Sequence, residues 1–155
     1  MAILPQERFS NVVNSLFSYI ETNYTLTQKE FQGQNALDTK TVKEWVWFGV
    51  QVASRRYERQ VTHDNTRGNI VSLFVTVYIM VKPSNNFLRV TEIRDTIVNL
   101  LRWASIQMQD YAGGTGLIGK LTGKDIPEEA DLGFEADVNR YRVTFLFDYI
   151  EQFTP

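Results

Sequence analysis

The chain of 155 residues contains no cysteine and a single histidine, His63. The absence of cysteine excludes disulfide bonds, thiol catalysis and cysteine-ligated zinc. A histidine metal site or a catalytic triad needs several partners of defined kind. His63 stands in a turn beside Asp64 and Asn65, where it is expected to be solvated. Stability must come from packing or from assembly, and we expect no metal and no cofactor.

The chain also lacks the apolar stretches that membrane insertion or secretion requires. Its longest apolar run, Ile70–Val81, is too short for a membrane helix, which needs about 20 residues. The N-terminus, MAILPQERF, has no basic segment followed by an apolar one, so we expect no secretory signal. The formal net charge of −2 gives no sign of a bulk nucleic-acid binder, although it leaves a local basic patch open.

The run from Ile70 to Val81, IVSLFVTVYIMV, is the stretch around which the rest is organised. Val, Ile, Tyr and Phe between turn residues predict a β-strand, whose alternate side chains point to opposite faces. One face is purely aliphatic and is expected to lie against helices: Val71, Leu73, Val75, Val77, Ile79 and Val81. The other is mixed and aromatic, and we expect a cover there too, another subunit being the candidate: Ile70, Ser72, Phe74, Thr76, Tyr78 and Met80.

Periodicity assigns the other segments. In chain order we predict a helix over about Pro5–Glu21, a polar loop over Tyr24–Thr41, a strand over Val42–Ala53 that continues to Val61, a turn over His63–Gly68, a helix entered at Val90 and Thr91 and fading by about Ser105, a short strand within Ile106–Tyr111, a turn-rich and then acidic connection over Ala112–Asp137, and a strand over Val138–Ile150.

These segments predict a single α+β domain over 1–155. The expected architecture is a mainly antiparallel sheet with a long β-hairpin and two helices packed on one face. Both hairpin strands exceed the usual length of about 5–6 residues, so its hydrophilic tip is expected to project beyond the core. Val75 and Phe145 are predicted to be buried.

The glycine-rich stretch Gly114–Gly119 satisfies GxGxxG but not its structural context. A dinucleotide loop needs a helix to follow it, because the helix N-terminus holds the phosphates, and the residues up to Pro127 cannot begin a long helix. The same stretch resembles a P-loop one residue too short, with Leu121 where the magnesium-binding hydroxyl belongs. We expect a flexible glycine loop.

Opposite charges are concentrated in two separate segments. Four arginines crowd the hairpin, and the segment 128–137 carries five acids and no base. The arginines are Arg55, Arg56, Arg59 and Arg67, and the acids include Glu128, Glu129 and Asp131. The arginines are explained by a charged edge that prevents strand pairing, by contact with a phosphate backbone, or by pairing with the acidic segment of a neighbouring subunit. Glu128 and Glu129 are adjacent and point apart, so they form no catalytic pair; a solvated acidic loop is the ordinary expectation.

Trp45 and Trp47 alternate with Val46 and Phe48, so both faces of their strand carry large apolar groups. Either the strand is buried on both sides or one face is an aromatic-rich subunit interface. We favour the interface, because 155 residues rarely enclose a sheet completely.

The element order and size resemble those of the tail terminator proteins of long-tailed, lambda-like bacteriophages. The segments that carry the resemblance are the Phe9–Ile20 helix, the Val42–Val81 hairpin, the Ile93–Leu101 helix and the Val138–Ile150 strand; the 112–137 connection departs from the family. The resemblance implies a non-enzymatic virion protein, assembled in the host cytoplasm, that forms a hexameric ring at the head–tail junction. Its implied partners are the tail tube protein, a head-completion or connector protein, and DNA passing through the lumen, with no membrane.

Three other functions stay open at this point. The first alternative is another neck, connector or tube-like ring protein. The chain is alternatively a small nucleotide-binding enzyme that uses the Gly114–Lys124 stretch, or a protein-binding module that stays monomeric.

Overall fold

The computed structural model describes residues 8–34, 36–58, 67–83, 86–111 and 117–153. They form two helices and seven strands in the order α1 (Phe9–Asn23), β1 (Gln28–Phe31), β2 (Glu44–Glu58), β3 (Arg67–Val81), α2 (Phe87–Leu101), β4 (Ser105–Gln109), β5 (Leu117–Gly123), β6 (Glu128–Glu135) and β7 (Val138–Phe153). None of the described helices is long and apolar enough to cross a membrane.

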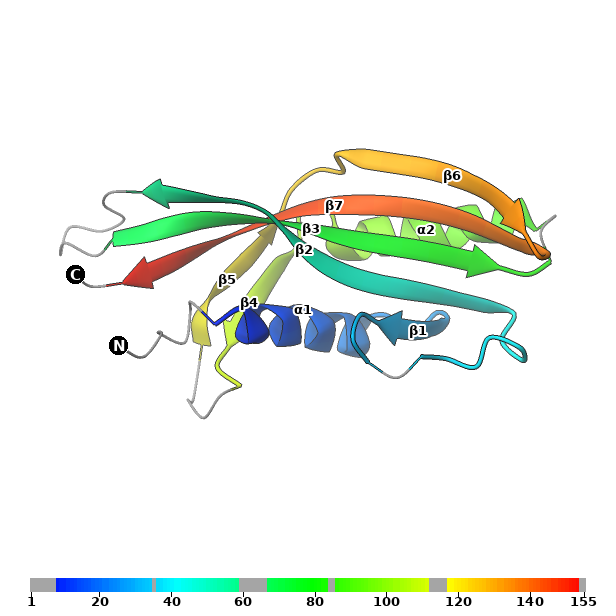
Figure 1. Ribbon diagram of the computed structural model, residues 1–155, viewed down its shortest axis with the longest axis horizontal. Helices are drawn as coiled ribbons and strands as arrows, with labels where there is room; N and C mark the ends of the chain where they lie inside the picture. The colour runs from blue at the N-terminus through cyan, green and yellow to red at the C-terminus, as the bar shows by residue number, and fades with distance from the viewer. Residues whose placement is uncertain (1–7, 35, 59–66, 84–85, 112–116, 154–155) are drawn as a thin grey trace.

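All seven strands belong to one curled sheet with the order β1-β2-β3-β7-β5-β4 (Figure 1). The strand β6 lies off this path and pairs with β7. Among the described strands, β1 and β2 pair in parallel, and the other pairings are antiparallel. The predicted α+β class with a mainly antiparallel sheet is therefore confirmed.

The strand β3 lies at the centre of the sheet, between β2 and β7. Its predicted aliphatic face is buried throughout, from Val71 to Val81, and the residues between them are each partly exposed. Val75 and Phe145 lie opposite each other in the β3–β7 ladder and are both 0% exposed, as predicted.

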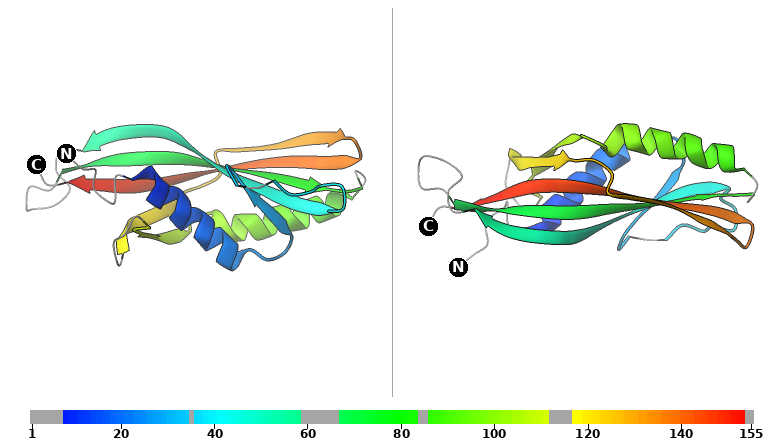
Figure 2. Two further views of the ribbon diagram at one scale, coloured as in Figure 1. Left: turned by 60° about the horizontal axis from the view of Figure 1, so that its bottom comes forward. Right: turned by 90° about the horizontal axis from the view of Figure 1, so that it is seen from above.

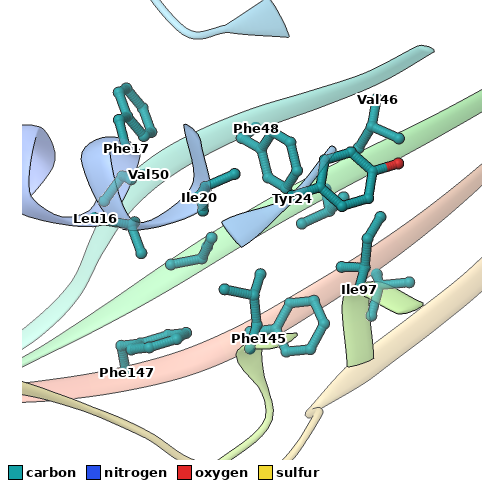
Figure 3. Close-up of a cluster of buried hydrophobic side chains, with 14 of the residues drawn as sticks. Leu16, Phe17, Ile20, Tyr24, Val46, Phe48, Val50, Ile97, Phe145 and Phe147 are labelled. Atoms are coloured by element: carbon teal, nitrogen blue, oxygen red, sulfur yellow. The ribbon is translucent and has the colours of Figure 1, made fainter. Parts of the chain in front are cut away.

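The buried residues of this aliphatic face and of both helices belong to one hydrophobic core cluster (Figures 2 and 3). The α1 stripe includes Leu16, Phe17 and Ile20, and α2 contributes Ile93 and Ile97. The helix α1 packs against β4, and α2 packs against β3 and β7. Helix α1 ends two residues later than predicted, and its expected start at Pro5 lies outside the described residues.

The predicted loop over Tyr24–Thr41 is wrong in its first part, because it contains the short strand β1. Only Phe31 of this strand is buried. Its ring centroid lies 4.7 Å from that of Phe17 and 5.6 Å from that of Phe48. The ring of Phe31 thus anchors β1 to the core, although the four residues of this strand show no alternation of apolar and polar side chains in the sequence.

The expected start of the second helix is also wrong. Helix α2 begins at Phe87, and Thr91 lies inside its first turns, where its hydroxyl donates to the Leu88 carbonyl at 2.7 Å. The helix ends at Leu101 rather than near Ser105. Arg102 already has an extended backbone, with φ −65° and ψ 127°, and Trp103 follows with a left-handed φ of 61° before β4 begins at Ser105. The predicted short strand after it is confirmed.

The connection over 112–137 contains two strands instead of loops. The end of the expected flexible glycine loop, residues 117–119, belongs to β5, whereas Gly114 and Gly116 lie outside the described residues. The expected acidic loop forms β6, which is joined to β7 by a tight turn at Ala136 and Asp137 with left-handed φ values of 49° and 60°.

Three strands continue together past the part of the sheet that α2 covers (Figure 1). We call this three-stranded end, residues 52–58 of β2, 67–72 of β3 and 148–153 of β7, the arm. The ladder between β2 and β3 has a bulge between Val52 and Ser54. Residues 63–66 of the expected turn, including His63, and the site candidate Arg59 lie outside the described residues, whereas Arg67 and Gly68 of that turn belong to β3.

Candidate functional site

No group of three or more histidine or acidic side chains in the described part of the chain is arranged to hold a metal ion. The candidate site is instead a surface, the face of β3 and its neighbours opposite the core. We call it the outer face. Its partly exposed members on the central strands are Phe74, Thr76, Tyr78, Thr144 and Leu146, with Thr144 the most buried at 9% exposure.

The two predicted interface tryptophans both lie on the outer face but differ in exposure. Trp45 is only 8% exposed, and the Lys82 ammonium lies 5.5 Å from its ring centroid. Trp47 is half-buried, with its ring centroid 5.6 Å from that of Tyr78. Trp45 is thus largely enclosed within its own chain, and Trp47 presents the more accessible surface.

Gly49 explains how Trp47 lies along the sheet. A Cβ atom added to Gly49 would lie 2.2 Å from Cη2 of the Trp47 indole. The ring therefore covers the backbone of Gly49, a close approach that only glycine allows. It follows that Trp47 is flattened onto the outer face rather than extended away from it.

The predicted acidic residue Glu129 is held within the chain. Arg94 of α2 donates from Nε to its Oε1 at 2.5 Å and from Nη2 to its Oε2 at 2.9 Å, and the Tyr141 hydroxyl donates to Oε1 at 2.8 Å. Hydrogen bonding from Arg94 lowers the pKa of the Glu129 carboxyl, against the opposing effect of burial. Burial, followed by the bond to Glu129, raises the pKa of Tyr141.

The other predicted acids also have partners inside the chain. Glu128 accepts a hydrogen bond from Arg142 of the neighbouring strand β7. Asp131 accepts one from the backbone N–H of Gly133 at 2.8 Å. An intersubunit contact through these carboxylates would therefore have to compete with contacts that each chain already makes.

A second two-pronged ion pair, which sequence reasoning missed, joins α2 to β2. Arg89 donates from Nε and Nη2 to the two carboxylate oxygens of Glu44, both at 2.7 Å. These bonds lower the pKa of Glu44. Together with the Arg94–Glu129 pair, they tie α2 to strands on both sides of the β3–β7 pair. Partners 45 and 35 residues apart in the chain leave no local sequence signal.

The predicted arginines that the structure describes lie far from the acidic segment. Arg55 is exposed on the arm, and Arg56 and Arg67 stand in the arm ladders opposite Ile70 and Phe153. The strand β6 lies at the other end of the molecule (Figure 1). Within one chain the described strands that carry Arg55, Arg56 and Arg67 therefore lie apart from the acidic strand β6.

The glycine-rich stretch borders a hollow of about 460 Å³ where β5 diverges from β7. Lys120, Lys124 and Asp148 are among its lining residues. Asp148 accepts a hydrogen bond from the Ser72 hydroxyl at 2.7 Å. Lys120 lies in a strand and the next described element is β6, so no described helix follows this stretch to hold a phosphate at its N-terminus.

The fold and these surfaces define an α+β protein with a curled, mostly antiparallel sheet. No family model matches the sequence, and no curated protein matches it. Several solved structures are similar to this chain. One of them has a TM-score of 0.55 at 10% sequence identity, over 95% of this chain and 94% of that chain. At such low identity the likeness shows the fold alone.

Proposed function

We propose that the protein is a structural subunit of a bacteriophage tail that forms a ring, terminates the tail tube and joins it to the head or neck. The proposal follows the resemblance in topology, in which β2 and β3 form one long hairpin and both helices lie on one face of the sheet. The observation that supports it is the outer face, a broad surface of half-buried aromatic and polar groups that includes Trp47, Phe74 and Tyr78. Subunit interfaces are enriched in such aromatic residues.

In this role the copies form a closed ring through a heterologous interface, in which one patch on each subunit meets a different patch on the next. The resemblance implies six copies. The ring covers the polymerising surface of the last tube ring and presents a different surface to the head-completion or connector protein. DNA passes through the lumen of this ring. Another neck, connector or tube-like ring would use the same outer face.

A second candidate is a small nucleotide-binding enzyme, which the hollow beside Lys120 and Lys124 favours. The strand geometry of β5 counts against it, because phosphate loops use a helix N-terminus. Calorimetric titration with ATP separates the two functions. Binding at micromolar concentration would contradict the structural role, and no heat of binding is expected.

The proposal is tested by placing a charge in the middle of the outer face. Thr76 of β3 lies opposite Gly49 of β2 and Thr144 of β7, so Thr76→Arg should block assembly while the long side chain reaches solvent in the free subunit. The matched control is Thr96→Arg on the exposed side of α2. We expect phage complementation and normal tail length with the control only. Normal tails with Thr76→Arg would contradict a role for this face.

A further inference from the structure

Strand β7 has an edge that no described strand covers. Strand β5 pairs with β7 only at its C-terminal end, over Thr122 and Gly123, and the two strands then diverge (Figures 1 and 2). Strand β7 meanwhile keeps its pairing with β3 as far as Phe153. On the side away from β3, residues 149–153 of β7 have no partner among the described strands. We call this segment the open edge.

The backbone of the open edge is oriented to accept a further strand. The Leu146 carbonyl accepts a hydrogen bond from the Lys124 N–H at 2.8 Å, so the backbone groups of Leu146 point towards β5. These groups alternate in direction along a strand. Ile150, four residues further on, therefore presents its N–H and C=O on the same side, beyond the end of the β5–β7 ladder. Unpaired backbone groups of this kind are a template for an added strand.

The hollow of about 460 Å³ described above lies beside the open edge. Part of its lining is apolar, from Ile70, Ile118 and Ile150. Ile70 and Ile150 lie opposite each other in the β3–β7 ladder, and Ile150 is 43% exposed. Two cations, Lys120 and Lys124, complete this side, and neither is paired with a carboxylate of a described residue. The hollow therefore suits a group that is both apolar and anionic.

An unpaired edge beside a side-chain hollow is the arrangement that binds extended peptides. Main-chain hydrogen bonds then supply the affinity, and the hollow selects the side chains. The two lysines favour carboxylates. The hollow also contains the Asp148 carboxylate, which accepts a hydrogen bond from the Ser72 hydroxyl at 2.7 Å. This carboxylate disfavours a polyphosphate, whose charge is concentrated, whereas a peptide can direct single carboxylates to the lysines.

We infer that the open edge binds an extended segment of a partner protein that carries a carboxylate two residues from a large apolar side chain. The two-residue spacing follows because the isoleucines and the lysines line one hollow, and residues two apart in a strand point to the same face. The segment pairs with the backbone of Ile150, places its apolar side chain against the isoleucines and directs its carboxylate to Lys120 and Lys124. The inference does not depend on the proposed ring, which uses the outer face of the central strands.

Two dye-labelled peptides of identical composition test the spacing. In TTLTETT the leucine and the glutamate are two residues apart, and in TTLETTT they are adjacent and point to opposite faces of a strand. Fluorescence polarisation with the full chain should show at least about tenfold tighter binding of TTLTETT. Equal affinity for the two peptides, or binding of neither, would overturn the inference.

The lysines have a charge-reversal test with a matched control. The double variant Lys120→Glu, Lys124→Glu should bind TTLTETT about tenfold more weakly than wild type does, and it should bind TTLTKTT, with lysine in place of glutamate, more tightly than wild type does. Lys40→Glu, at an exposed lysine between β1 and β2, should change neither affinity. An unchanged peptide preference in the double variant would contradict the role of the lysines.

The apolar contact has its own pair of variants. Ile150→Ser should weaken binding of TTLTETT, and Val52→Ser, at a residue that is 42% exposed on β2, should not. Circular dichroism melting should show that every variant remains folded. Equal effects of the two substitutions would place the peptide elsewhere. If no peptide binds and the lysine reversal instead lowers the assembled mass of the protein alone, the open edge contacts a second copy and the inference fails, while the ring proposal stands.

Discussion

The replacement of Gly123 by alanine tests how β5 is positioned against the turn that follows α2. A Cβ atom added here would lie 2.5 Å from the Leu101 carbonyl oxygen and 2.8 Å from the Ala104 backbone nitrogen. Both are backbone atoms, so no side chain can rotate away. Restoring ordinary contact of about 3.4 Å to the carbonyl oxygen requires a shift of roughly 0.9 Å in tightly packed surroundings.

That shift also stretches the hydrogen bond from the Gly123 N–H to the Ala104 carbonyl, which is 2.7 Å long. Overpacking costs about 1–3 kcal/mol and the loss of one hydrogen bond about 1 kcal/mol. We therefore expect Gly123→Ala to lower the free energy of unfolding by about 2–4 kcal/mol, measured by urea denaturation.

Gly119 in the same strand is the matched control. A Cβ atom there would meet only the Met108 sulfur, at 3.6 Å, which is ordinary contact. Gly119→Ala should leave the free energy of unfolding unchanged within about 0.5 kcal/mol or increase it slightly, because it reduces the freedom of the unfolded chain. Equal effects of the two substitutions would refute the assigned close approach at Gly123.

Three further predictions concern stability. Val75→Ala removes two methyl groups from a side chain that is 0% exposed and should cost about 2–3 kcal/mol in chemical denaturation; a loss under about 1 kcal/mol would argue against its central place. The pKa values of Glu44 and Glu129 are lowered in the folded state, so their stabilisation is complete above the unfolded pKa of about 4.3 and is lost as the pH falls through the folded values. Urea unfolding between pH 6 and pH 3 should show a shallower decline for Glu129→Gln than for wild type, and equal slopes would count against the Arg94 pair. Ala136 has a left-handed φ of 49°, so Ala136→Gly should raise the free energy of unfolding by about 0.5–1 kcal/mol in urea denaturation. A lower free energy of unfolding would contradict the left-handed conformation of this turn residue.

The long periodic signals of the sequence were sufficient for the centre of the fold. Alternation over Ile70–Val81 predicts which face of β3 is buried. The strand is paired along both edges, by β2 and β7, so the burial of its side chains depends on which of the two faces they occupy. The apolar stripe of α1 is equally clear. These elements bury apolar groups along their whole length, and burial is the property that periodicity reports.

The missed strands depend on contacts that local sequence does not contain. Strand β6 has exposed acids typical of loops, but Arg142 of β7 and Arg94 of α2 hold two of them in place. Its turn uses Ala136 and Asp137 without the glycine that usually signals such geometry. In strand β5, Gly123 permits a close approach to the backbone of Leu101 and Ala104.

The candidate surface was predictable in composition but not in geometry. The sequence indicates that Trp45 and Trp47 share a face, yet only the fold distinguishes the enclosed Trp45 from the more accessible Trp47. Likewise, the position of Arg55 near the end of a strand was foreseeable. Its alignment with Val52 was not, because it depends on the bulge. The pairing of arginines with a neighbour's acids stays a prediction.

The mass of the purified protein in solution tests the central claim most directly. Light scattering across a range of protein concentrations, with negative-stain images of the same samples, reports both copy number and closure. The account predicts a closed ring with a mass that is a small multiple of the 18.0 kDa subunit. A mass that stays at 18.0 kDa at every concentration, without ring-shaped particles, would contradict it.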